Sequence, residues 1–208
     1  GAKALSLDLS EPKAFTEIEQ IIGSKTLDVI VAGPPCQGFS LSGPRNFDDE
    51  RNKLYLAVIK TVETFKPKVF VIENVPGMAT LYKGEIKNEI LRRFEKLGYN
   101  IDCKILCAAD YGVPQVRKRL IFMGVRKDIG VPNFPKPILE VKDYVSCREA
   151  IDDLPSREDG IGEDVDKYIV LPKTEYQRAM RGNCNILRNH VGTNHTQLVR
   201  DTIALVPE

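Results

Sequence analysis

Short runs of apolar residues alternate along the chain with stretches in which apolar residues recur every three or four positions. The runs are rich in β-branched side chains, which is typical of strands buried on both faces, and the periodic stretches predict amphipathic helices. The predicted strands lie at residues 4–9, 28–32 and 69–72, and the predicted helices at residues 12–22, 54–65 and 86–97. This alternation predicts an α/β fold with a doubly wound, mostly parallel sheet, in which Ser10 caps the first helix.

The pattern changes after residue 98. Residues 101–106 alternate between apolar and polar side chains, and an apolar run follows at residues 120–125. These two segments predict an antiparallel hairpin at the far edge of the sheet. Three prolines within residues 131–137 then predict a boundary that divides the chain into residues 1–130 and 131–208.

The second region has weaker patterns. Residues 147–154 predict a short helix, and the acidic, glycine-containing stretch at 152–166 predicts a solvated loop. Residues 173–200 are basic, polar and weakly periodic.

Composition narrows the functional classes. The 208 residues include 30 basic and 29 acidic side chains, so a nucleic-acid partner would have to be met by a local patch. The chain has no apolar run long enough to cross a membrane and no signal-peptide pattern, which predicts a cytoplasmic protein without a membrane partner. Five cysteines in no regular framework predict reduced thiols. The first residue is not Met, and we expect the sequence to be a piece of a longer protein.

The strand at residues 28–32 is followed by Gly33-Pro34-Pro35, which stops it because neither proline can donate to a ladder. Cys36 is the first reactive side chain after this turn. Open α/β sheets bind ligands at the carboxyl ends of their strands, so Cys36 is predicted to be a nucleophile. The alternative is a buried, inert cysteine, which is disfavoured because the surrounding loop has few apolar residues.

Two further loops are predicted to leave the same edge of the sheet. One carries Glu73 and Asn74 directly after a strand, and the other carries Gln115, Arg117 and Arg119. A structural ion pair is the alternative role for the glutamate, and a solvated charged face is the alternative for the arginines. A thiol, a partly buried carboxyl and paired guanidinium groups together suit a flat electrophilic heterocycle.

Three segments resemble, in order and spacing, the catalytic motifs of the cytosine carbon-5 DNA methyltransferases. They are Gly-Pro-Pro-Cys-Gln-Gly-Phe-Ser at 33–40, Glu-Asn-Val at 73–75 and Gln-Val-Arg-Lys-Arg at 115–119. Residues 51–55, 91–99 and 148–155 resemble other segments of that family. The resemblance implies the Rossmann-like methyltransferase fold of DNA modification enzymes. Residues 1–130 would be part of the catalytic domain, and residues 131–208 a linker and the N-terminal part of a target-recognition domain.

The resemblance also implies a reaction. A methyl group would pass from S-adenosylmethionine to carbon 5 of a cytosine flipped out of double-stranded DNA. Cys36 would add to carbon 6, Glu73 and Arg119 would hold the ring, and Arg117 would support them and lower the pKa of the thiol. The residues implied to contact the cofactor are Asp8, Leu9, Pro35 and Leu54. Those implied to contact the substrate are Gln37, Ser40, Ser42, Asn74 and Gln115.

The sequence departs from the family at both ends. The glycine-rich turn that cradles the cofactor and the final Asn-containing block are missing, so we expect these 208 residues to be inert alone and to self-associate through an unpaired sheet edge. A tRNA cytosine methyltransferase of the same fold, or an idle fragment that binds DNA, are the alternatives. The recognition region favours DNA, with phosphate contacts from Arg178, Arg181, Arg188 and Arg200. His190 and His195 lie in a polar loop without clustered thiols, and no metal site is predicted.

Overall fold

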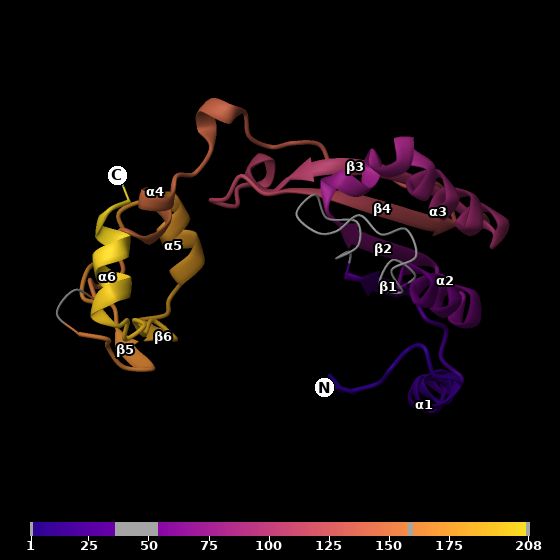
Figure 1. Cartoon of the computed structure of the whole chain (residues 1–208), viewed down its shortest axis with the longest axis horizontal. Coiled ribbons are helices and arrows are strands. Elements are labelled where there is room, and N and C mark those ends of the chain that lie inside the picture. Colours follow the sequence, from indigo (N-terminus) through magenta and orange to yellow (C-terminus); the bar gives the residue numbers. More distant parts are fainter. Residues whose placement is uncertain (1, 36–53, 158–159, 207–208) are drawn as a thin grey trace. The chain divides into compact units, whose positions relative to one another are not determined.

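The computed structural model describes residues 2–35, 54–157 and 160–206. The chain forms two compact units (Figure 1). Unit 1 comprises residues 1–111 and 116–138, and unit 2 comprises residues 112–115 and 139–208. The chain passes from unit 1 to unit 2 after residue 138, and the proline-containing segment 131–138 is bound to unit 1 by hydrogen bonds at Pro135 and Ile138.

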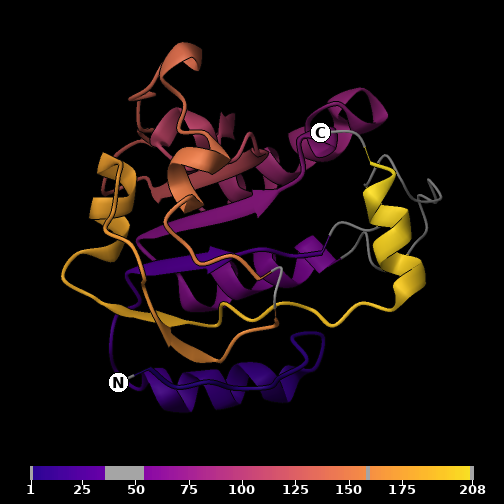
Figure 2. The ribbon, with the colours of Figure 1, turned by 90° about the vertical axis from the view of Figure 1, so that its left-hand side faces the viewer.

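A four-stranded sheet of order β1-β2-β4-β3 forms the centre of unit 1. Its strands are β1 (Val29–Ala32), β2 (Val69–Asn74), β3 (Tyr99–Cys107) and β4 (Lys118–Arg126). The first two strands pair in parallel, and their arrows point the same way in Figure 2. The other two pairs, β2 with β4 and β3 with β4, are antiparallel, so the described sheet is mixed. The α/β class and the edge hairpin are thus confirmed, and each predicted strand of the hairpin is longer at both ends.

Helices cover one face of this sheet. They are α2 (Leu54–Phe65) and α3 (Glu85–Lys96), with the short 3-10 helices η3 (Pro76–Ala79) and η4 (Leu81–Gly84) before α3. A further 3-10 helix, η5 (Ala108–Tyr111), follows β3. Apolar side chains of α2 and α3 share one core with Phe70, Ile72 and Phe122. The Phe70 ring lies over β4 so closely that a Cβ atom on Gly124 would come within 2.1 Å of it, so only glycine fits at that position.

The N-terminal segment differs from its prediction. Residues 4–9 form no strand, since they pair with no neighbour among the described residues. Asp8 closes a turn after them by accepting a hydrogen bond from the backbone N–H of Ser10 at 2.8 Å. The first helix, α1 (Pro12–Ile22), begins with Pro12 and ends before Gly23 at φ 61°, as its sequence indicates. Its N-cap is Glu11 rather than Ser10, since a proline at the first helical position fixes the cap at the residue before it.

The outer edge of β1 pairs with no strand in the described ranges. Among the described strands, β1 pairs only with β2, and Val29 and Val31 are 51% and 76% exposed. Backbone donors and acceptors along this edge therefore face outward.

Unit 2 is built from short elements. They are η6 (Val141–Asp143), α4 (Cys147–Ile151), β5 (Val165–Lys167), α5 (Glu175–Arg181), β6 (Ile186–Arg188) and α6 (Gln197–Ala204). Both α4 and α5 start with a capping box, formed by Ser146 with Glu149 and by Thr174 with Gln177. The buried Gln177 amide also donates to the carbonyl of Glu149 at 3.0 Å, and this bond ties the two helices together.

Most described residues of the acidic stretch at 152–166 are exposed, as its composition indicates, but two of its carboxylates are not simply solvated. Asp153 is buried and paired with Arg181 at 3.2 Å, and Asp166 is paired with Arg157 at 3.0 Å. Composition alone could not show these two partners. Across the described ranges, no helix is long and apolar enough to cross a membrane.

Candidate active site

The carboxyl ends of β1 and β2 lie side by side. Because these strands pair in parallel with Ala32 opposite Ile72, the turn after β1 and the last residues of β2 leave the same edge of the sheet. A Cβ atom added to Gly33 would lie 4.0 Å from Oε2 of Glu73. The Glu73 carboxylate is therefore next to the backbone that leads into Cys36. Four predicted site residues fall outside the described ranges: Cys36, Gln37, Ser40 and Ser42.

Glu73 forms an ion pair with Arg119, the second residue of β4. Nε of Arg119 lies 2.5 Å from Oε1 of Glu73. Glu73 is opposite Ile121 in the ladder, and Arg119 comes two residues before Ile121, so the two charged side chains share one face of the sheet. They are 44% and 25% exposed, so the pair contributes little to stability. It holds a carboxylate and a guanidinium together where a polar ring could reach both.

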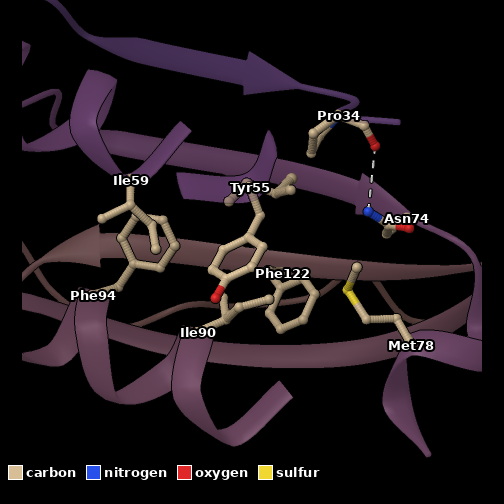
Figure 3. Close-up of a pocket in the computed structure, with 9 residues that line it drawn as sticks. Pro34, Tyr55, Ile59, Asn74, Met78, Ile90, Phe94 and Phe122 are labelled. Atoms are coloured by element: carbon tan, nitrogen blue, oxygen red, sulfur yellow. Dashed lines mark hydrogen bonds between the residues drawn. The ribbon is translucent and has the colours of Figure 1, made fainter. Parts of the chain in front are cut away.

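Asn74 links the end of β2 to the turn after β1. Its side chain is 3% exposed, and its Oδ1 accepts a hydrogen bond from the backbone N–H of Val75 at 2.9 Å. Its Nδ2 donates to the carbonyl oxygen of Pro34 at 3.5 Å, the dashed line in Figure 3. One amide group thus connects the strand that carries Glu73 to the loop that carries Cys36.

A small cavity lies beneath this link (Figure 3). Its volume is about 10 Å³, and its walls include Pro34, Tyr55, Met78 and Phe122. Such a volume is about that of one water molecule, so this cavity is a small gap between packed side chains and cannot hold a cofactor. Burial raises the pKa of the Tyr55 hydroxyl, which keeps the ring neutral. The turn after β1 is therefore supported by packed side chains of α2 and η3.

Arg117 lies just before β4 and differs from Arg119 in its contacts. Its backbone carbonyl accepts a hydrogen bond from Ala108 N at 2.9 Å, while its exposed guanidinium has no acidic partner among the residues that the structure describes. Arg117 and Arg119 both line a pocket of about 230 Å³. Gln115 is exposed and belongs by its contacts to unit 2, as do the residues of the turn before it.

Two residues of this pocket carry no sequence signal. Tyr111, the last residue of η5, donates from its hydroxyl to the carbonyl oxygen of Pro135 at 3.1 Å, and both residues line the pocket beside Arg117. They are 24 positions apart in the sequence. Nothing in their local patterns pairs them, so sequence reasoning could not have found this contact.

The described residues proposed for the cofactor offer few contacts. Asp8 is exposed, and hydrogen bonds from Ser10 lower the pKa of its carboxyl, so it stays ionised and can accept a hydrogen bond from an amine. Leu9 is half-buried, Pro35 is exposed, and Leu54 begins α2 with its side chain outside the described set. An ionised acceptor such as Asp8 fits an amine group of a bound cofactor.

The thiols and histidines of the described residues form no metal site. Groups of three or more His, Cys, Asp or Glu that could hold a metal ion do not occur there. Four cysteines in this part of the chain are free thiols: Cys103, Cys107, Cys147 and Cys184. Burial raises the pKa of Cys103, which keeps it protonated and unreactive.

The arginine side chains of unit 2 differ in how far they are exposed and could reach a DNA phosphate. Arg181 is enclosed: its side chain is 7% exposed, it pairs with Asp153, and its guanidinium stacks 3.8 Å from the centre of the Tyr168 ring. The predicted phosphate contact from Arg181 is therefore wrong, because the side chain is already used inside unit 2. Arg178, Arg188 and Arg200 are exposed.

The chain is similar to several known proteins. The family model described as C-5 cytosine-specific DNA methylase matches residues 10–204. The type II methyltransferase M.DdeI of Desulfomicrobium norvegicum is 42% identical over 194 residues, which cover 89% of this chain and 46% of that protein. M.AgeI of Thalassovita gelatinovora is 38% identical over 208 residues, covering 89% and 48%. This chain therefore spans about half the length of these relatives.

A solved structure is also similar. It belongs to a protein described as a DNA modification methyltransferase encoded within a prophage of E. coli. The TM-score is 0.69 at 27% identity, over 96% of this chain and 61% of that one.

Proposed function

The chain belongs to the C-5 cytosine-specific DNA methylase family, and on this premise we propose that the whole protein methylates carbon 5 of cytosine in double-stranded DNA, as part of DNA modification at the nucleoid. The observation that supports this most is the Glu73–Arg119 pair beside Gly33, at the edge where the loop with Cys36 leaves β1. The family uses a methyl donor of the S-adenosylmethionine type.

The proposed reaction begins with the Cys36 thiolate. Its sulfur forms a bond to carbon 6, and the electrons of the 5,6 double bond move toward carbon 5 and the ring. Glu73 shares a proton with ring nitrogen 3 and Arg119 donates to the 2-oxygen, so that the developing negative charge is offset. After methylation, carbon 5 loses its proton to a base, the bond from carbon 6 to sulfur breaks, and the thiolate is released.

S-adenosylmethionine supplies the electrophilic methyl group when bound, and Asp8, Leu9, Pro35 and Leu54 are the residues proposed to hold it. Because the target atoms lie inside the duplex, the cytosine must leave the base stack. Gln37, Ser40, Ser42 and Gln115 are proposed to contact DNA around the flipped base.

The roles of Asn74 and Arg117 are proposed from their contacts. Asn74 was predicted to touch the substrate, and its burial and its bond to Pro34 support a role in fixing the Cys36 loop relative to Glu73. Arg117 has an exposed guanidinium without an acidic partner in the described ranges, so it is suited to meet a DNA phosphate or to support Arg119. The tRNA-directed alternative is less favoured, since the matching family is DNA-directed.

Trapping of a covalent adduct tests this function. In a duplex that contains 5-fluorocytosine, carbon 5 has no proton to lose, so the full-length protein should remain bonded to DNA through Cys36. Cys36→Ala should form no adduct. Cys184→Ala, a matched change at an exposed thiol of unit 2, should react like wild type. An adduct formed by Cys36→Ala at wild-type yield would contradict the assignment.

We propose in addition that these 208 residues self-associate through the outer edge of β1. The edge is unpaired within the described ranges, and Val31 on it is 76% exposed. Val31→Lys should reduce association, measured by sedimentation at micromolar concentration, because a charge on an edge strand opposes pairing. A wild-type chain that sediments as a monomer would contradict the proposal.

A further inference from the structure

Residues 131–138, here called the strap, are part of unit 1 although their prolines predicted a linker. Phe134 within the strap is buried, and the ammonium group of Lys104 lies 5.1 Å from the centre of its ring. At the start of the strap, the Asn100 amide donates to the carbonyl of Gly130 at 2.7 Å. At its end, Ile138 N donates to the carbonyl of Asp110 at 2.9 Å. The strap is thus held along its whole length.

The points where the chain leaves or re-enters unit 1 are bound to one another. The chain leaves after Tyr111, returns at Val116, and leaves again after Ile138. Tyr111 donates to Pro135, three residues before the last of these points. Next to the return point, Ala108 N donates to the carbonyl of Arg117. Since Ala108 and Tyr111 are the first and last residues of η5, one short helix connects the strap to the backbone of Arg117.

The same residues enclose one pocket. Tyr111, Pro135, Arg117 and Arg119 are among its walls, together with apolar side chains of β3 and β4. Pro135 is thus the point at which the strap reaches this pocket. If the strap lost its hydrogen bond with Tyr111, η5 would be held less firmly. Ala108 of η5 would then hold the backbone of Arg117 less firmly as well.

We propose that Tyr111 and the strap form a clamp that positions Arg117, and that Tyr111 is a positioning residue for the reaction. The catalytic part of this inference rests on the proposed function. Tyr111 touches neither the cytosine nor the cofactor in this proposal. It acts through Pro135 and η5, which hold the segment that carries Arg117. In the sequence, residues of unit 2 come directly before this segment, at Gly112–Gln115, and directly after it, from Leu139 onward.

The test compares two Tyr→Phe variants of the full-length protein. Tyr111→Phe removes the hydroxyl that binds the Pro135 carbonyl. Tyr99→Phe is the matched control, because the Tyr99 hydroxyl also donates to a proline carbonyl, that of Pro67 at 2.7 Å, at the other end of the sheet. Circular dichroism establishes that both variants are folded.

Two measurements are made on each variant. Hydrogen exchange should become several-fold faster at the amides of Ile138 and Ala108 in Tyr111→Phe, and only there. Adduct formation with 5-fluorocytosine DNA should slow by about tenfold, because a misplaced contact affects the reacting geometry, while DNA binding stays close to wild type. Tyr99→Phe should leave the adduct rate and both amides unchanged.

The outcomes separate the clamp from the proposed function. If Tyr111→Phe matches wild type in adduct rate and in exchange at Ala108, the clamp is wrong. A faster Ile138 amide with an unchanged Ala108 amide would also overturn it, since the strap would then not reach Arg117. If wild type forms no adduct, the proposed function fails, and exchange at Ala108 alone decides the clamp.

Discussion

Replacement of Asn74 by alanine is the most informative single change at the strand ends. The side chain is 3% exposed, so water cannot replace it easily. Loss of Oδ1 leaves the Val75 N–H without its acceptor, which costs about 1–3 kcal/mol for a buried donor. The bond from Nδ2 to Pro34 is 3.5 Å long, at the limit for a hydrogen bond, and adds only about 0.5 kcal/mol.

The expected loss of stability is therefore about 1.5–3.5 kcal/mol, the sum of these two contributions. For a chain of this size, each kcal/mol lowers the Tm by about 2–4 °C, so thermal unfolding should shift by about 3–14 °C. Tyr99→Phe is the matched control. It also removes a side-chain donor to a proline carbonyl, that of Pro67, but at the other end of the sheet. It should cost about 1 kcal/mol.

The two variants should differ more in function than in stability. Asn74 connects the Cys36 loop to the Glu73 strand, so its loss should slow adduct formation with 5-fluorocytosine DNA on the order of tenfold to a hundredfold below the melting temperature. Tyr99→Phe should react at the wild-type rate. The reasoning would be refuted if the variants had equal adduct rates, because the bridge to Pro34 would then have no part in placing the loop.

Three other changes test separate parts of the structure. Glu73→Gln should lower the rate of methyl transfer on the order of a hundredfold. It should leave stability nearly unchanged, because the pair with Arg119 is half-exposed. A near-normal rate would show that Glu73 has a structural role only. Arg181→Met should lower the free energy of unfolding in urea by about 3–5 kcal/mol, because it leaves Asp153 buried without a partner. Adding Asp153→Leu should restore part of this loss. An Arg181→Met variant as stable as wild type would show that the pair does not contribute to stability. Hydrogen bonds from Ser146 lower the pKa of Glu149, so the contribution of this carboxylate to stability is present at neutral pH and is lost as the pH falls through that lowered pKa. Glu149→Gln should therefore have a different Tm from wild type at neutral pH but the same Tm in strong acid. An equal difference in Tm at both pH values would contradict the linkage.

The strands and helices that could be predicted are those whose signal is local. β1 and β2 are apolar runs closed by a turn or a polar residue, and α2 and α3 repeat apolar residues at helical spacing, so a window of the sequence suffices. Residues 4–9 have the same apolar pattern as a strand and do not form one. A short strand exists only when a neighbour pairs with it, and no window of sequence contains that information.

The candidate site divides in the same way. The residue types and spacing of Glu73 and Arg119 predict that they lie near each other, and the sheet brings them together, while their catalytic roles stay a prediction. The long-range contacts in both units could not be predicted. Asn74 and Pro34 are 40 positions apart, Tyr111 and Pro135 are 24 apart, and Arg181 and Asp153 are 28 apart, so each partner is chosen by the fold.

The Glu73–Arg119 pair shows why an ion pair and a functional role are not true alternatives at such an edge. A half-exposed pair adds little to the free energy of folding, so stability alone gives little reason to place a carboxylate after four apolar residues of a strand. The same partial exposure lets a polar ring reach both groups, and the neighbouring Asn74 and Arg117 are anchored through buried or backbone hydrogen bonds. A weak pair held by rigid neighbours can exchange partners with a substrate at little cost, whereas the enclosed Arg181–Asp153 pair cannot. Exposure of the pair, more than its presence, is therefore the observation that favours chemistry at the end of β2.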